Sequence, residues 1–182
     1  MNLLLFETLV EEILLPPGDS RSLHVREVLR RVPGDEIDVA VVNGPKGKAT
    51  VLEDCESGMR LSFLWEEVVE DDRCPIHLLL GLSRPQTARK ILGQASSLGV
   101  TAMNFFGAEK GEASYADSKL WRTGEWRRHR SRGIEQAFCS FLPEVRRFGN
   151  LEDVLLDIPE LGQRVALDVY EAETSLSPND AV

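Results

Sequence analysis

Cysteine and long apolar runs are both scarce in this sequence. The three cysteines, Cys55, Cys74 and Cys139, are odd in number, widely spaced and form no C-x-x-C pair. Such a set predicts neither a disulfide framework nor a zinc site or other metal site, and it suits a reducing cytoplasm. No apolar run approaches the roughly 20 residues of a membrane helix. The apolar N-terminus lacks a basic segment and soon meets three glutamates, so it is a poor signal peptide. We therefore expect a cytoplasmic protein with no membrane partner.

Positive charge is also in short supply, because the formal net charge is −9. That total argues weakly against a nucleic-acid partner, but the charges are unevenly distributed. Residues 119–147 hold eight Lys or Arg and only three Asp or Glu. A run of this kind is either a solvated helix face or an anion-binding surface, and the charge pattern alone favours the solvated face.

The first 73 residues have the pattern of a small all-β domain. Apolar residues alternate in "GDEIDVAVV" (34–42), "ATVLEDC" (49–55) and "RLSFLWEEV" (60–68), with turn residues between them. Short strands at this spacing predict a small barrel. The preceding stretch 20–35, "SRSLHVREVLRRVPGD", predicts a helix that Ser20 or Ser22 caps and that Pro33-Gly34 ends.

A different pattern begins after Cys74. The apolar run 76–82 predicts a strand covered on both faces. Residues 83–99 predict a helix with Ser83 as its cap, Pro85 in its first turn and Gly99 in the left-handed conformation at its end. With the next apolar stretch, 100–107, this makes a strand–helix–strand unit and hence a parallel sheet.

The rest of the chain predicts a functional loop, two helices and a final strand. The long polar connection 109–124 exceeds what a crossover needs, and loops of that size are often functional. A helix is expected over 125–141 and a short one around Leu151. "RVALDVY" (164–170) then has the alternation of a closing buried strand.

Two stretches, in this order, resemble one known family. "HVREVLRRVPGDEIDV" (24–39) precedes "LLLGLSRPQTARKILGQASSLGV" (78–100), and a helix with "GIEQAFCSFLPEV" (133–145) follows. The order is similar to that of the RsmE-type 16S rRNA uridine N3-methyltransferases of the SPOUT superfamily. The resemblance covers essentially the whole chain.

The resemblance implies an α/β protein of two domains. Residues 1–73 would form a PUA-like β-barrel that helps to hold RNA, and residues 74–182 a SPOUT-type parallel α/β domain. In the family that second domain binds S-adenosyl-L-methionine in a trefoil knot and forms a homodimer. The implied activity is methylation of a uridine N3 in 16S ribosomal RNA of the small subunit.

The sequence departs from the family at several positions. Relatives often have lysine where this chain has Ser83-Arg84, glutamate at position 97 and arginine at position 139, where Ser97 and Cys139 stand here. The family also continues past the "RVALDVY" strand into a Gly-Pro-Glu-Gly-Gly-like loop that forms the knot. This chain has no such loop, so we expect its knot segment to be missing and its activity to be in question.

The resemblance also selects candidate site residues. The loop Tyr170, Glu171 and Ala172 is expected to line the cofactor site, because ligands gather at the carboxyl ends of parallel strands. The same rule selects Ser83, Arg84 and residues 107–110. The RNA-binding candidates are Arg21, His24, Arg26, Arg30 and Arg84. A further group, Arg122, Arg127, Arg128, Arg130 and Arg132, surrounds Trp121 and Trp126, which either stack on bases or pack inside the protein. No residue is a convincing general base.

Two functions remain open from the sequence. One is an rRNA methyltransferase, and the other is a non-catalytic RNA-binding module derived from such an enzyme.

Overall fold

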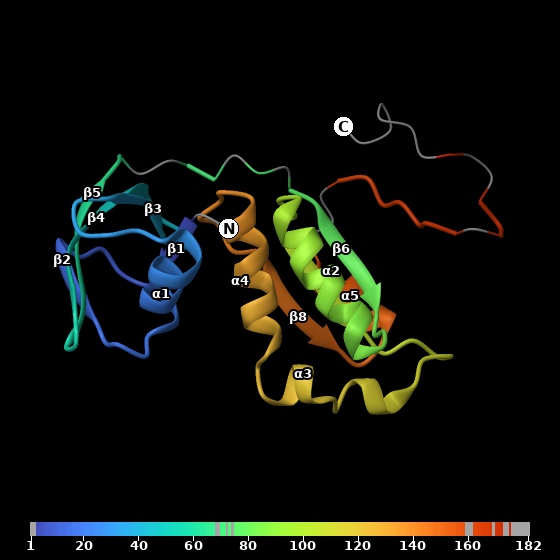
Figure 1. Cartoon of the computed structure of the whole chain (residues 1–182). Coiled ribbons are helices and arrows are strands. Elements are labelled where there is room, and N and C mark those ends of the chain that lie inside the picture. The colour runs from blue at the N-terminus through green and yellow to red at the C-terminus, as the bar shows by residue number, and fades with distance from the viewer. Residues whose placement is uncertain are drawn as a thin grey trace.

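The computed structural model describes residues 3–67, 70–71, 73, 75–158, 162–168, 170–172 and 175. It is a mixed α/β structure with one curled sheet and one parallel sheet (Figure 1). We call residues 3–67 the β region and residues 75–158 the α/β region. None of the helices in the described residues is long and apolar enough to cross a membrane.

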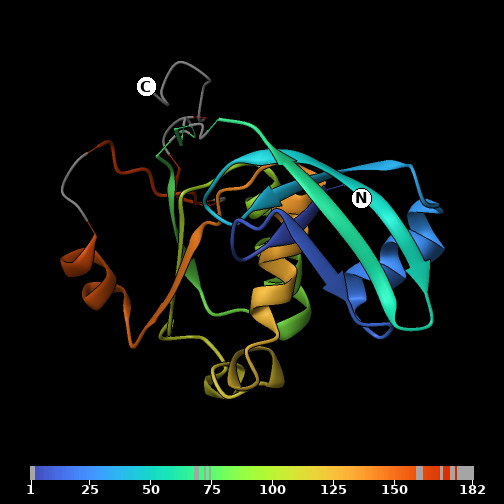
Figure 2. The same cartoon turned by 90° about the vertical axis from the view of Figure 1, so that its left-hand side faces the viewer.

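The β region is a five-stranded sheet in the order β1-β3-β4-β5-β2. Its strands are β1 (Leu3–Phe6), β2 (Glu12–Leu15), β3 (Glu36–Val41), β4 (Lys46–Cys55) and β5 (Gly58–Trp65). Figure 2 shows β4 and β5 as long bent strands that curl the sheet around its core. The predicted alternation is confirmed, because Val39, Val51 and Leu61 are fully buried. The sequence reasoning missed β1 and β2, which pair with β3 and β5.

A short helical segment covers one side of this sheet. It consists of α1 (Ser20–Leu23) and the π-helix η1 (His24–Leu29), and Val25 anchors it in the core. The cap is Asp19, whose carboxylate accepts a hydrogen bond from Arg21 N, and not Ser20 or Ser22 as predicted. The reason is that the Ser22 hydroxyl turns back to donate to Asp19 O. Arg30, in the left-handed conformation, ends the segment.

The α/β region has a three-stranded parallel sheet in the order β6-β7-β8. Its elements are β6 (His77–Gly81), α2 (Pro85–Ser97), β7 (Ala102–Phe106), η2 (Ala113–Tyr115), α3 (Lys119–Arg122), α4 (Trp126–Gln136), β8 (Glu144–Phe148) and α5 (Leu151–Asp157). Pro85 stands in the first turn of α2 and Gly99 has φ +78°, both as predicted. Ser83 is not the cap of α2, because Arg84 occupies that position without a side-chain cap bond.

One strand of this region was not predicted, and one strand predicted after the region was wrong. Residues 144–148 form β8, which the sequence did not indicate because Arg146 and Arg147 interrupt any apolar pattern on this outer strand. Residues 164–168 were predicted as a buried strand, yet they form none, and Val165 and Leu167 are 50 % and 81 % exposed. Alternation alone cannot make a strand, because the backbone groups need a neighbouring strand to bond with. Val169 lies outside the described residues.

Helices α2 and α4 pack backbone to backbone on one face of the parallel sheet. A Cβ atom on Gly133 would lie 2.4 Å from Gly93 O and 2.5 Å from Ser96 Cβ, so only glycine fits there. The Ser97 hydroxyl donates across the same contact to Gly133 O at 3.0 Å. Below the helices the core contains Leu92, Met103 and Phe105 among its buried residues. The contact sets how close α4 approaches the sheet.

The two regions meet where α4 ends. Asn43, at the β3–β4 turn, donates from its backbone N–H to Ser140 O at 2.9 Å. Its side-chain oxygen accepts from Leu142 N at 2.8 Å. Arg73 donates to the carbonyls of Val100 and Phe141 at 3.3 and 3.1 Å. In Figure 1, α4 stands between β1 and α2, and it contacts both. These bonds fix the β region against the α4–β8 link.

The glycine at position 133 gives a stability test. We expect Gly133→Ala to destabilise the protein by roughly 1–3 kcal/mol, because the added methyl overpacks the contact. Urea unfolding followed by circular dichroism measures the change.

The matched control is Gly93→Ala on the facing helix. Its Cβ would meet only His129 O at 3.8 Å, an ordinary contact. We expect this variant to be neutral or more stable by up to about 1 kcal/mol, since alanine favours helix. Equal losses in the two variants would contradict the packing argument.

Candidate functional site

The three parallel strands end at the same level. Gly81, Phe106 and Phe148 lie side by side in register. The sheet continues one step further, because Leu82 N donates to Phe106 O at 2.7 Å and Gly107 N to Phe148 O at 3.4 Å. The loops after β6, β7 and β8 therefore meet at one edge, which we call the carboxyl edge. Ligands of open α/β sheets bind at this kind of edge.

Glycines make the carboxyl edge narrow. A Cβ on Gly107 would lie 2.6 Å from Gly149 O, so the two loops touch through their backbones. Gly81 has only the Ala108 methyl near its would-be Cβ, at 3.5 Å. Close backbone approach of this kind leaves main-chain groups exposed to whatever lies above the edge.

The long connection after β7 folds back over the carboxyl edge, as expected for a functional loop. Arg84 Nε contacts the Tyr115 hydroxyl at 3.4 Å, and Arg147 Nη1 donates to Ala116 O at 2.8 Å. Two hydroxyl oxygens, on Ser83 and Ser118, are buried without a hydrogen-bond partner in the described residues. Buried hydroxyls normally have partners, so these two are a cue for a polar ligand or a water. The sequence pointed to Ser83, Arg84 and residues 107–110 but missed Tyr115 and Arg147.

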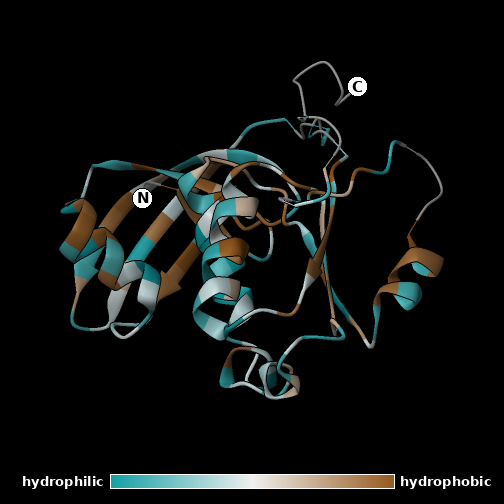
Figure 3. Cartoon of the chain, turned by 90° about the vertical axis from the view of Figure 1, so that its right-hand side faces the viewer, coloured by the Kyte–Doolittle hydropathy of each residue, from teal (hydrophilic) through white to brown (hydrophobic). Residues whose placement is uncertain are grey.

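An open hollow of about 490 Å³ lies beside this edge. Its lining comes from the end of β8 and from α5: Arg147, Phe148, Gly149, Asp153, Leu156 and Asp157. Figure 3 shows α5 as a largely apolar helix that stands out from the rest of the molecule. Leu156 is 87 % exposed, so apolar surface is open to solvent here.

The residues predicted to line a cofactor site lie elsewhere. Tyr170, Glu171 and Ala172 are exposed, and the Asp168 carboxylate accepts hydrogen bonds from Tyr170 N and Glu171 N. These two bonds lower the pKa of Asp168. In Figures 1 and 2 the red segment 162–168 runs near the top of the molecule, whereas the carboxyl edge lies below. The cofactor role of this loop stays a prediction.

The RNA-binding candidates fall into two groups. Four of them belong to α1, η1 and the residue after it, and two of these four are already paired. Arg21 bonds Asp19 at 2.7 Å, and Arg26 makes two hydrogen bonds to Asp54. These ion pairs hold the pKa of both aspartates below the usual range. His24 is partly buried and Arg30 is exposed. Arg84, the fifth candidate, lies at the carboxyl edge.

The other arginine group decorates α4. Glu125, just before the helix, binds Arg89 at 2.8 Å and His129 at 3.3 Å, which lowers the Glu125 pKa to about 2. Trp126 packs beneath the guanidinium groups of Arg127 and Arg130, at 4.7 and 5.1 Å from its ring centre.

Both tryptophans serve packing. Trp121 is buried and stands edge-on to Phe105, with ring centres 4.8 Å apart. The rings of Trp121 and Trp126 are therefore covered by the protein's own groups and are not free platforms for bases. The packed alternative of the sequence analysis is confirmed.

Comparison with known proteins identifies the family. The family model for the RNA methyltransferase domain matches residues 70–181, more than half of the chain. The chain belongs to the RNA methyltransferase family. The ribosomal RNA small subunit methyltransferase E of Treponema pallidum is 36 % identical over 153 residues, which are 80 % of this chain and 56 % of that protein. The ribosomal RNA small subunit methyltransferase E 1 of Borreliella burgdorferi is 23 % identical over 155 residues, or 85 % and 65 %.

Solved structures of methyltransferases share the fold. One is a ribosomal RNA small subunit methyltransferase E from Neisseria gonorrhoeae, bound to S-adenosyl methionine, with a TM-score of 0.68 at 20 % identity. The match covers 88 % of this chain and 67 % of the Neisseria gonorrhoeae chain. A methyltransferase from Legionella pneumophila, in complex with the cofactor SAM, has a TM-score of 0.70 at 16 % identity, with coverage of 86 % and 66 %. The chain spans less than two thirds of the length of both curated relatives.

One carboxylate on α4 gives a pH test. Burial raises the pKa of Glu135 from 4.5 to about 6. A raised carboxyl pKa opposes folding once the group ionises, so its cost appears as the pH rises from about 4.5 through 6 and persists above. We expect Glu135→Gln to stabilise the protein at pH 7.5 by about 1 kcal/mol, half the full value of such a shift because water still reaches the side chain. Urea midpoints at pH 4.0 and 7.5 measure it.

The gain should shrink toward pH 4.0, where wild-type Glu135 is already protonated. Glu56→Gln, in an exposed turn, removes the same charge and serves as the control. A gain from Glu135→Gln that is equal at both pH values would contradict the assignment.

Proposed function

We propose that this chain acts in the S-adenosyl-L-methionine-dependent methylation of a uridine N3 in 16S ribosomal RNA. Two facts support the proposal: membership of the RNA methyltransferase family and the names of the two curated relatives. The observation that carries it is the carboxyl edge, where three strand ends, the unpartnered buried hydroxyl of Ser83 and the arginines Arg84 and Arg147 come together. This edge offers a polar ligand both space and hydrogen-bonding groups.

The chemistry needs positioning more than it needs reactive side chains. Methyl transfer from a sulfonium is an in-line displacement, so alignment of nucleophile, methyl and leaving sulfur carries much of the rate. The uridine N3 must lose its proton, which leaves an anionic ring. Arg84 and Arg147, at the carboxyl edge, supply positive charge that would stabilise such an anion. We assign no general base.

Several finer assignments belong to the same proposal. Tyr170, Glu171 and Ala172 would line the S-adenosylmethionine site, which requires segment 162–172 to leave its described path and approach the carboxyl edge. Arg21, His24, Arg26, Arg30 and Arg84 would contact RNA. The β region would act as a PUA-like barrel, the α/β region as a SPOUT-type domain, and two copies would pair as a homodimer in the cytoplasm.

A second function is favoured by two observations. The Tyr170–Ala172 loop lies away from the carboxyl edge, and basic side chains are exposed on α4. A non-catalytic RNA-binding module fits both observations, since it needs the basic surfaces but no cofactor site.

The first test separates these two functions. The chain is titrated with S-adenosylmethionine by calorimetry and then incubated with the cofactor and unmodified 16S rRNA. Nucleoside mass spectrometry looks for N3-methyluridine. Cofactor binding with formation of this nucleoside supports the enzyme. RNA binding without cofactor binding and without N3-methyluridine supports the module. Failure to bind either the cofactor or RNA would contradict both functions.

The second test concerns the arginines after α1. We expect Arg26→Gln with Arg30→Gln to weaken rRNA binding about tenfold and to reduce the slope of log affinity against log salt by about 1 to 2, because each phosphate contact contributes about 0.9. Fluorescence anisotropy over a salt series measures both. Asp54→Asn is the matched control, since it breaks the Arg26 ion pair but keeps the cation. An unchanged slope would remove Arg26 and Arg30 from the RNA site.

A further inference from the structure

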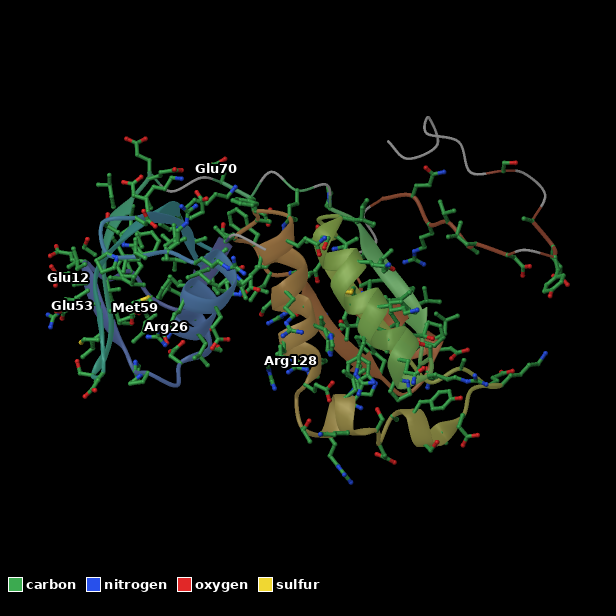
Figure 4. The ribbon with its side chains drawn as sticks, viewed as in Figure 1. Glu12, Arg26, Glu53, Met59, Glu70 and Arg128 are labelled. Atoms are coloured by element: carbon green, nitrogen blue, oxygen red, sulfur yellow. The ribbon has the colours of Figure 1, made fainter. Side chains whose placement is uncertain are left out.

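We infer that the solvent face of α4 is a second phosphate-binding surface, which grips the backbone of structured RNA separately from α1 and η1. The surface consists of Arg127, Arg128 and Arg132, which are exposed on α4. Figure 4 labels Arg128 on the flank of α4 opposite to α2. The inference rests on the proposed function only in assuming that the chain binds rRNA.

The first argument is a local concentration of unpaired charge. Some surface cations of this acidic protein are held in ion pairs with carboxylates, as Arg26 and Arg60 are. No ion pair within the described residues joins Arg127, Arg128 or Arg132 to a carboxylate. These three exposed cations lie close together on one helix.

The second argument is that no nearby carboxylate forms an ion pair with these arginines within the described residues. Glu125 is shared between Arg89 and His129, and Glu135 attracts Arg132 without a contact of that kind. Arg128 and Arg132 stand one turn apart on the same helix face, where like charges destabilise a helix by a few tenths of a kcal/mol. An anion bound between the guanidinium groups of Arg128 and Arg132 would relieve this repulsion.

The third argument concerns what kind of anion fits. Protein interfaces need an apolar centre, but the exposed residues of α4 are Arg127, Arg128, Arg132 and Gln136, all polar. The Trp126 ring lies under Arg127 and Arg130 and therefore cannot stack on a base. What remains is a row of guanidinium groups, whose planar forks match phosphate oxygens. The surface thus suits the phosphate backbone of RNA, and its binding should not depend on the base sequence.

The test removes the two unstacked arginines. We expect Arg128→Gln with Arg132→Gln to weaken binding of a structured 16S rRNA fragment about tenfold at low salt. The slope of log affinity against log salt should fall by up to about 2, because each phosphate contact on a duplex contributes about 0.9. The same loss is expected with a fragment of scrambled sequence and equal secondary structure. Fluorescence anisotropy over a salt series gives both quantities.

A stability readout separates binding from folding. Removing two like charges one turn apart should leave the melting temperature unchanged or raise it by about 1 °C. Lys48→Gln with Arg60→Gln is the charge-matched control, because both cations are paired in the β region. Figure 4 labels Glu53, the partner of Arg60, at the far end of that region from α4. We expect this control to keep the wild-type salt slope.

Each remaining outcome decides the question. Wild-type RNA affinity and slope in the α4 variant would overturn the inference and leave the proposed function intact. Failure of the wild-type chain to bind any rRNA fragment would overturn both.

Discussion

The contact between α2 and α4 at Gly133 is the constraint on which the arrangement of this molecule depends. Helix α4 touches three things at once: α2, the core of the parallel sheet and strand β1 of the β region. Because no side chain separates the helices at Gly133, α4 lies close against α2, and residues 140–142, which follow α4, meet Asn43. A larger spacing would move the α4 arginines and the β region together. Packing therefore couples the basic surface to the fold of the sheet.

Local signals in the sequence predicted most elements whose cause is local. Pro85 and Gly99 indicated helix α2, and alternation indicated β3, β4 and β5, because each of these signals depends on a few neighbouring residues. Strands β1 and β2 were missed. Strand β8 depends instead on an open position beside β7, and its two arginines hide any pattern. The stretch 164–168 fails in the opposite way: it has the pattern but no described partner strand. The periodicity of apolar residues does not show which strands distant in the sequence will pair.

The site shows the same division between local and tertiary information. The strand–helix–strand pattern was enough to bring Ser83, Arg84 and residues 107–110 to one edge. Arg147 and Tyr115 were missed because their place depends on β8 and on the fold of the long connection. Charge counts were also incomplete, since a sequence shows how many arginines a segment has but not which carboxylates neutralise them. Asp54 lies 28 residues from Arg26, and only the folded chain brings the two together.

The junction at Asn43 is made almost entirely of main-chain groups. Its N–H donates to the carbonyl of residue 140, and its side-chain oxygen accepts from the N–H of residue 142. Both partners are backbone groups, so the bonds do not depend on the side chains at positions 140 and 142. With φ near +54°, the position itself suits asparagine or glycine, and only asparagine supplies the amide. At these two bonds, the requirement on the amino-acid sequence therefore falls on Asn43. Residues 140 and 142 can vary as long as the backbone keeps its path, except that proline at position 142 would remove the N–H donor.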